Sequence, residues 1–225
     1  MVEYVSPTGK DVLLTTLRWS GGVALGAVVA LSVSVFEMLL RAALRRFRLA
    51  ILPFTIVFDF LRALPVIALV PLVQMLGVDE WWKFALIAWA VTFPTWLAIR
   101  QSWLEQMIDT ELALKASGLR KIYIFRSYDL PKAFRGLLRG IEISIGIAWI
   151  STVAAEWIGN LRPGFWDGGL GYRVEYAHQS ANWNGVLACL GLFGVLGVVS
   201  TFLWRAFVTR ELRLPRIWSL ARHGN

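Results

Sequence analysis

The 225-residue sequence has little charge and almost no cysteine. Only 17% of its residues are charged and 57% are hydrophobic, whereas a soluble domain averages about 25% charged residues. One domain of this length could not bury so many apolar side chains, which excludes an ordinary soluble protein. The single cysteine, Cys189, excludes a disulfide scaffold. The density of aromatic and branched residues excludes disorder. The composition therefore indicates an integral membrane protein.

Motifs for nucleotide binding and for hydrolysis are also absent. The sequence has no G-x-x-x-x-G-K phosphate loop, no H-E-x-x-H zinc pattern and no G-x-S-x-G elbow. Neither His178 nor His223 has a partner at a spacing that suggests a metal site. We expect no catalytic residue, no metal site and no cofactor bound by this chain.

Five apolar segments are each about long enough to cross a bilayer, which takes about 20 helical residues. They cover approximately residues 12–40, 49–78, 82–99, 140–159 and 183–205. None shows the period-two alternation of a membrane barrel. We predict an all-α membrane protein in which residues 1–225 form a single transmembrane domain.

Basic residues are unevenly divided between the connections. The linker after the first segment, the long connection 101–139 with its flanking Arg100, and the tail from Arg205 onward hold 17 of the 23 Lys and Arg residues. Lys and Arg favour the cytoplasmic side of a membrane. We therefore predict a multi-pass protein with its C-terminus in the cytoplasm, and we attribute the net charge of +8 to these connections rather than to nucleic-acid binding.

The connection 101–139 is the longest polar stretch between segments. Asp109 and Glu111 suit the first turn of a short helix, and Gly118 suits its C-terminal cap. A second short helix is expected over about residues 120–128, ending near Leu130-Pro131. Such a helix–glycine–helix could dock a cytoplasmic partner, or it could be a solvated basic loop.

The same stretch resembles the EAA loop of permease subunits of bacterial ABC importers. Ala113, Gly118, Leu130 and Pro131 match that motif at its spacing, whereas Leu112 stands at its Glu position and Glu111 lies one place early. The segments 60–72, 154–159 and 169–172 are similar to the nitrate, sulfonate, taurine and bicarbonate branch. That branch usually has six spans, so we expect the first to be missing here, either naturally or through loss of the N-terminus.

The resemblance implies a type I importer permease in a bacterial inner membrane, which forms the pathway for a small anionic solute. The coupling loop (Asp109, Glu111, Ala113, Gly118, Leu130 and Pro131) would bind a separate ATPase subunit that carries ATP and Mg²⁺. Further expected partners are a second permease chain, identical or different, two ATPase subunits in all, a periplasmic or lipid-anchored binding protein and membrane lipid.

Four residues are candidates for the pathway: Asp59, Arg62, Pro65 and Glu156. Ionisable groups at membrane depth generally face a bundle interior or a water-filled cavity. Asp59 and Arg62 share a helix face and could be only an intrahelical pair, or Arg62 could attract an anion. Pro65 could merely kink the second span. Glu156 could serve helix-end structure or gating, and Glu37 is expected to anchor a span at the membrane interface.

Small residues recur on two spans, at Gly22 and Gly26 and again at Gly191, Gly194 and Gly197. We expect both faces to pack against neighbouring helices. Other functional classes remain open. A membrane-embedded enzyme would need more polar groups inside the spans, an ion-gradient-driven secondary transporter would be expected to show internal repeats, and a membrane-embedded scaffold would leave the EAA-like loop unexplained.

Overall fold

The computed structural model describes residues 7–43, 52–76, 79–104, 130–157 and 168–212. The described residues form helices and contain no strand. The helices are α1 (Gly9–Ala43), α2 (Leu52–Ala63), α3 (Val66–Leu76), α4 (Glu80–Leu104), α7 (Leu130–Trp157), α8 (Leu170–Gln179) and α9 (Trp183–Leu212). The predicted all-α class is confirmed.

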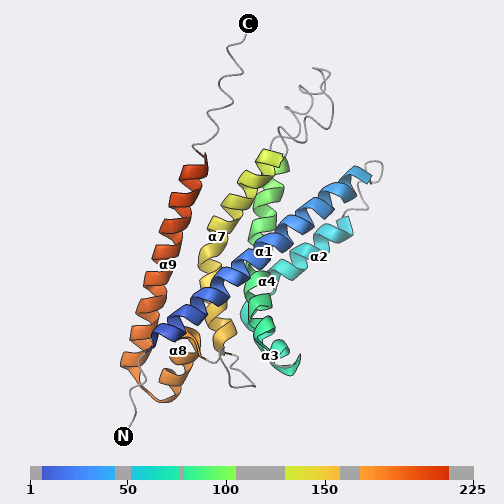
Figure 1. Cartoon of the computed structure of the whole chain (residues 1–225). Coiled ribbons are helices and arrows are strands. Elements are labelled where there is room, and N and C mark those ends of the chain that lie inside the picture. Colours follow the sequence, from blue (N-terminus) through green and yellow to red (C-terminus); the bar gives the residue numbers. More distant parts are fainter. Residues whose placement is uncertain (1–6, 44–51, 77–78, 105–129, 158–167, 213–225) are drawn as a thin grey trace.

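Among the described helices, α1, α4, α7 and α9 are each long and apolar enough to span a membrane, and the bent pair α2–α3 could be a fifth span. In Figure 1, α1 crosses obliquely in front of α7 and α4, while α9 and α2 lie at opposite edges. The short helix α8 lies at the end of the bundle where α1 and α4 begin and α7 ends. We call this the α8 end.

The second span, predicted as one kinked helix over residues 49–78, is instead two helices bent by 87°. Pro65 lies in the break between α2 and α3. Proline has no N–H to continue a helix and clashes with the preceding turn, and its carbonyl oxygen accepts a hydrogen bond from the Ala68 N–H as α3 begins. Pro53 and Pro71 lie within helices and do not break them.

Glycines allow α1, α4 and α7 to approach closely. A Cβ built on Gly26 of α1 would lie 2.7 Å from Cβ of Val91 on α4. A Cβ on Gly140 of α7 would lie 2.6 Å from the Thr95 Cα, also on α4. Substitution at either position therefore requires the helices to separate, because the obstructing atoms include backbone or buried branched side chains. The packing role predicted for the first glycine face is confirmed.

The second glycine face behaves differently. Among the described residues, a Cβ on Gly191 or Gly194 of α9 would meet nothing within 4 Å, and one on Gly197 would reach Trp149 alone, at 3.9 Å. The predicted packing of this face is wrong within one copy of the chain for Gly191 and Gly194. Helix α9 instead contacts α7 through another face, where the indole Nε1 of Trp149 donates a hydrogen bond to Ser200 at 2.9 Å.

Two further boundaries differ from the predictions. The sequence predicts no helix between the segments 140–159 and 183–205, but Leu170–Gln179 form α8, whose buried side includes Leu170, Val174 and Ala177. The fourth span was expected to begin near residue 140, but α7 begins at Leu130. Its first three turns carry Lys132, Arg135 and Arg139, which lower the hydropathy of this part of the helix, so hydropathy alone missed it.

Candidate functional site

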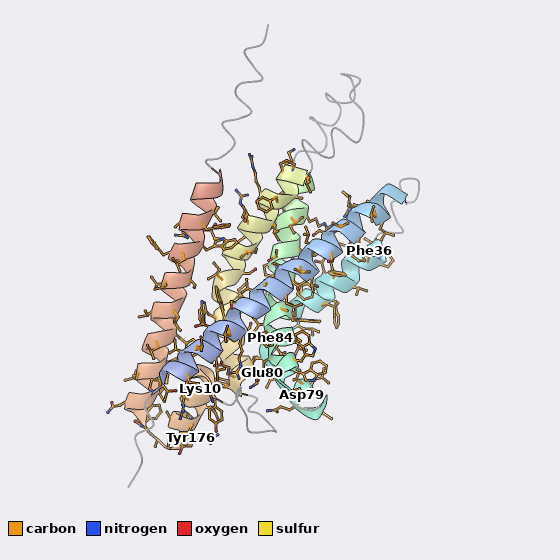
Figure 2. All side chains as sticks on the ribbon, viewed as in Figure 1. Lys10, Phe36, Asp79, Glu80, Phe84 and Tyr176 are labelled. Atoms are coloured by element: carbon orange, nitrogen blue, oxygen red, sulfur yellow. The ribbon has the colours of Figure 1, made fainter. Side chains whose placement is uncertain are left out.

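Four charged side chains from three helices meet at the α8 end. We call Arg18 of α1, Glu80 and Lys83 of α4, and Glu156 of α7 the charged cluster. The side chains of Arg18 and Glu156 are 0% exposed, that of Lys83 is 2% exposed and that of Glu80 is 17% exposed. Figure 2 shows Glu80 at the end of the bundle that also holds Lys10 and Tyr176, away from Phe36.

Arg18 lies at the centre of the charged cluster. Its Nη1 donates to Oε1 of Glu156 at 2.8 Å and to the Gly168 carbonyl at 2.6 Å, and its Nε donates to Glu80. Lys83 Nζ lies 3.5 Å from Oε2 of Glu80. Two cations thus face two carboxylates. This balance matters because an unpaired charge at a buried position costs several kcal/mol.

The charged cluster is joined to the start of α8. Helix α8 has no capping side chain of its own, since Gly169 stands at its N-cap. Its first N–H groups are instead satisfied from other helices: Gly171 donates to Glu156 at 2.7 Å, Leu170 to Thr15 at 2.8 Å and Gly169 to Asp11 at 3.1 Å. The exposed donors of a helix N-terminus attract carboxylates. These hydrogen bonds connect the start of α8 to α1 and α7.

Glycine is required at the start of α8, where these hydrogen bonds form. Gly168 and Gly169 have φ angles of +110° and +124°, which residues other than glycine rarely adopt. A Cβ on Gly169 would collide with the Glu156 carboxylate and would approach Arg18 Nη1 to 2.7 Å. The glycines let the backbone touch two charged side chains directly.

A second polar group lies toward the opposite end of α1. The Glu37 carboxylate accepts hydrogen bonds from Arg41 Nε and from Trp96 Nε1, both at 2.9 Å, and lies 3.4 Å from Arg100 Nε. Glu37 is 3% exposed and Trp96 is fully buried. The sequence suggested an interfacial anchor, but the carboxylate is buried and links α1 to α4.

The predicted pathway residues fall into two places. Arg62 Nη2 and Asp59 Oδ1 lie 3.3 Å apart on α2, so the predicted pairing is confirmed, and their side chains are 42% and 48% exposed. Pro65 marks the bend after α2. Glu156 lies apart from them, in the charged cluster. A pathway role for these residues stays a prediction.

Most of the coupling loop lies outside the described residues, including Asp109, Glu111, Ala113 and Gly118. Leu130 and Pro131 are described and open α7, where Pro131 is tolerated because first-turn N–H groups have no intrahelical acceptor. Helix α7 thus runs without a break from the end of the EAA-like motif to Glu156 in the charged cluster.

The sequence reading missed Thr15, Arg18, Glu80 and Lys83 as partners of Glu156. A partial signal existed: Glu80 and Lys83 are three residues apart, and Thr15 and Arg18 share one face of α1. The sequence alone could not show that these pairs contact each other and Glu156, because the contacting residues are 62 to 141 positions apart in the chain. Within the described ranges, no group of three or more His, Cys, Asp or Glu side chains gathers as metal ligands would.

The fold defines a class: a multi-pass helical membrane protein whose spans are held together by close glycine contacts and buried ion pairs. Comparison with known families is more specific. The chain belongs to the family of binding-protein-dependent transport system inner membrane components, whose model matches residues 22–214. The resemblance drawn from the sequence motifs is confirmed, and so is a multi-pass inner-membrane location.

Curated relatives carry consistent names. The chain is 30% identical over 167 residues to the candidate aliphatic sulfonates transport permease protein SsuC of Escherichia coli (strain K12), covering 71% of this chain and 56% of that protein. It is 29% identical over 209 residues to a probable ABC transporter permease protein of Brucella melitensis biotype 1, covering 92% and 78%. It is 25% identical over 155 residues to the taurine transport system permease protein TauC of Escherichia coli (strain K12), covering 68% and 54%. The chain thus spans about half the length of SsuC and TauC.

Proposed function

We propose that this chain is the permease subunit of an ATP-driven importer for a small anionic solute of the sulfonate or taurine type. The observation that carries the proposal is the family match over residues 22–214, which includes the EAA-like loop and three members of the charged cluster, Glu80, Lys83 and Glu156. The names of the relatives SsuC and TauC support the substrate class. A binding protein would deliver the solute, and a second permease chain would complete the pathway.

In this proposal the loop from Asp109 to Pro131 binds an ATPase subunit that holds ATP and Mg²⁺. Helix α7 supports the proposal because it is continuous from Pro131 to Glu156. With a rise of about 1.5 Å per residue, its 28 residues extend about 42 Å, enough to cross the bilayer core. A displacement of the loop would therefore reach the charged cluster through a single rigid element.

The test is co-purification of the tagged chain with the products of its neighbouring genes in mild detergent, followed by an ATPase assay. A variant carrying Ala113→Glu and Gly118→Val should lose the ATPase subunit, because a β-branched residue disfavours the positive φ expected at Gly118. Membrane levels of the chain should stay unchanged.

The matched control is Gly191→Val, the same substitution at a glycine whose Cβ would meet nothing within 4 Å. This variant should keep the ATPase subunit. Equal retention of the ATPase by the loop variant and the control would refute the coupling role. Failure of uptake of taurine or an alkanesulfonate into proteoliposomes by an ATPase-active complex would refute the substrate class alone.

A further inference from the structure

The buried carboxylate of Glu37 connects α1 to the part of α4 that leads into the EAA-like loop. Its Oε2 accepts a hydrogen bond from Trp96 Nε1, and its Oε1 accepts one from Arg41 Nε and lies 3.4 Å from Arg100 Nε. Arg41 lies on α1 itself, whereas Trp96 and Arg100 lie on α4. Glu37 therefore has two partners that join helices and one that does not.

These contacts lie close to the loop. Arg100 is one helical turn before Leu104, where α4 ends and the connection with the EAA-like loop begins. Helix α7 begins after that connection and packs on the same part of α4, since a Cβ on Gly136 would lie 2.8 Å from the Ile99 Cα. The two helices that flank the loop thus meet within one turn of Arg100, and Glu37 joins α1 to them.

The contact through Glu37 differs in kind from the glycine contact between the same two helices. Gly26 lies against Val91, and apolar surfaces can slide or turn on one another because their attraction has no preferred direction. The hydrogen bond from Trp96 to Glu37 is directional. Trp96 is fully buried, with the ring of Phe58 from α2 at 5.1 Å. The bond to Glu37 therefore fixes the rotation and the height of this part of α4 relative to α1.

Arg100 is held to Glu37 by charge. Its Nε is buried and has no hydrogen-bond partner among the described residues, while Nε and Nη2 of Arg41 both donate to the carboxylate oxygen that Arg100 faces. The guanidinium carbon of Arg100 lies 5.3 Å from the centroid of the Trp96 ring, within the range of a cation–π contact. Both attractions require a positive charge at position 100 rather than one hydrogen-bond geometry.

We propose that Glu37 is a positioning residue for coupling: through Trp96 and Arg100 it makes α1 follow the movement that the ATPase subunit imposes on the end of α4. The inference rests on the proposed function and adds a second route to the one through α7. Arg18 precedes Glu37 by 19 residues on α1, or about 28 Å. Helices α1 and α7 then carry the movement to the two sides of the pair between Arg18 and Glu156.

The experiment uses the complex of the chain with its ATPase subunit and binding protein in proteoliposomes. It measures how much taurine or alkanesulfonate is imported per ATP hydrolysed. A variant that merely assembles less well keeps this ratio, because both rates fall together. Arg100→Gln should lower the ratio at least about fivefold, the lower end of typical coupling between two sites.

The matched control is Arg41→Gln, which removes an arginine from the same carboxylate oxygen but within α1 itself. This variant should keep the ratio of the unaltered chain. Arg100→Lys keeps the positive charge and should retain most of the coupling. A purely structural role of the buried charges would instead leave the ratio unchanged in all three variants.

A second measurement needs no solute. On a Cys189→Ala background, Leu39→Cys places a thiol on α1 near Glu37, where the leucine is 58% exposed. Its rate of alkylation by a maleimide is measured in detergent, with and without the ATP and vanadate that trap the ATPase subunit. The rate should change on trapping. Adding Arg100→Gln should abolish that change, and adding Arg41→Gln should not.

Equal ratios for Arg41→Gln and Arg100→Gln, no recovery with Arg100→Lys, or an alkylation rate at Leu39→Cys that trapping does not change would each overturn the inference. Each of these results, obtained with an ATPase-active complex, leaves the proposed function intact. Failure of the unaltered chain to retain an ATPase subunit would refute the proposed function and the inference with it. Lack of uptake by an ATPase-active complex would refute the substrate class, and the alkylation rates then decide the inference.

Discussion

Loss of the Glu156 charge should destabilise the protein more than any single surface change. Glu156→Gln keeps the size and an acceptor oxygen, but it leaves Arg18 and Lys83 facing one carboxylate, Glu80, at buried positions. Breaking a buried ion pair by removing one partner costs about 3–5 kcal/mol. Arg18→Met should cost a similar amount, because Glu156 then loses its ion-pair partner and keeps the hydrogen bonds from Thr15 and from the Gly171 N–H.

The double variant Arg18→Met/Glu156→Gln separates a charge effect from loss of packing. It leaves the Lys83–Glu80 pair balanced, so its cost should be smaller than the sum of the single costs by about 2 kcal/mol or more, as expected for residues in one network. The assay is thermal unfolding in mild detergent. For a chain of this size, 1 kcal/mol corresponds to about 2–4 °C in Tm, so a cost of about 3–5 kcal/mol should lower the Tm of each single variant by about 6–20 °C.

The control is the exposed pair Arg205–Glu142, whose N–O distance of 3.0 Å resembles that of the buried pair. Glu142→Gln should change Tm little, because solvent screens an exposed pair. If Glu156→Gln lowers Tm no more than Glu142→Gln, or if the two single effects simply add in the double variant, the charge-balance argument is refuted.

Two further predictions concern glycines. Gly140→Ala should lower Tm relative to Gly146→Ala on the same helix, by the equivalent of about 1–3 kcal/mol. The reason is that a Cβ on Gly140 meets the backbone of α4, whereas a Cβ on Gly146 meets no described atom within 4 Å. Equal Tm values would show that α4 and α7 are not in close contact. Gly169→Ala should expose the start of α8 to hydrogen exchange and proteolysis, because alanine is strained at a φ of +124° and its Cβ collides with Glu156. Unchanged protection of α8 would show that the hydrogen bonds from α1 and α7 do not hold its start in place.

The spans were predictable because hydropathy acts over segments of about 20 residues. The core of every predicted span is helical, but the kink expected at Pro65 is instead a break between two helices. The 87° angle of that break was not predictable, because it depends on how α3 packs through Val66, Leu69 and Val70 against the bundle. Helix α8 was missed because its polar residues dominate its hydropathy, and its start is stabilised by side chains from other helices.

The candidate site was predictable only in part. Glu156 could be singled out as an ionisable residue near a span end, and Asp59–Arg62 could be paired from its spacing. The partners of Glu156 could not be found, because Thr15 and Arg18 precede it by 141 and 138 residues. The glycine faces illustrate the same limit: Gly26 and Gly194 look equivalent in sequence, and only the arrangement of helices shows that one is in contact and the other is open.

The ion pairs of Arg18 and the hydrogen bonds at the start of α8 have a consequence for the order in which the chain assembles. Arg18 enters the membrane with α1 before either of its acidic partners exists as part of a spanning helix, since Glu80 follows 62 residues later and Glu156 138 residues later. During synthesis the guanidinium must therefore remain at the membrane surface or be shielded by the insertion machinery, and α1 reaches its final depth only after α7 arrives. Closure of α8 over Glu156 requires both α1 and α7 to be in place, so protection of its first turn reports that these two helices have come together.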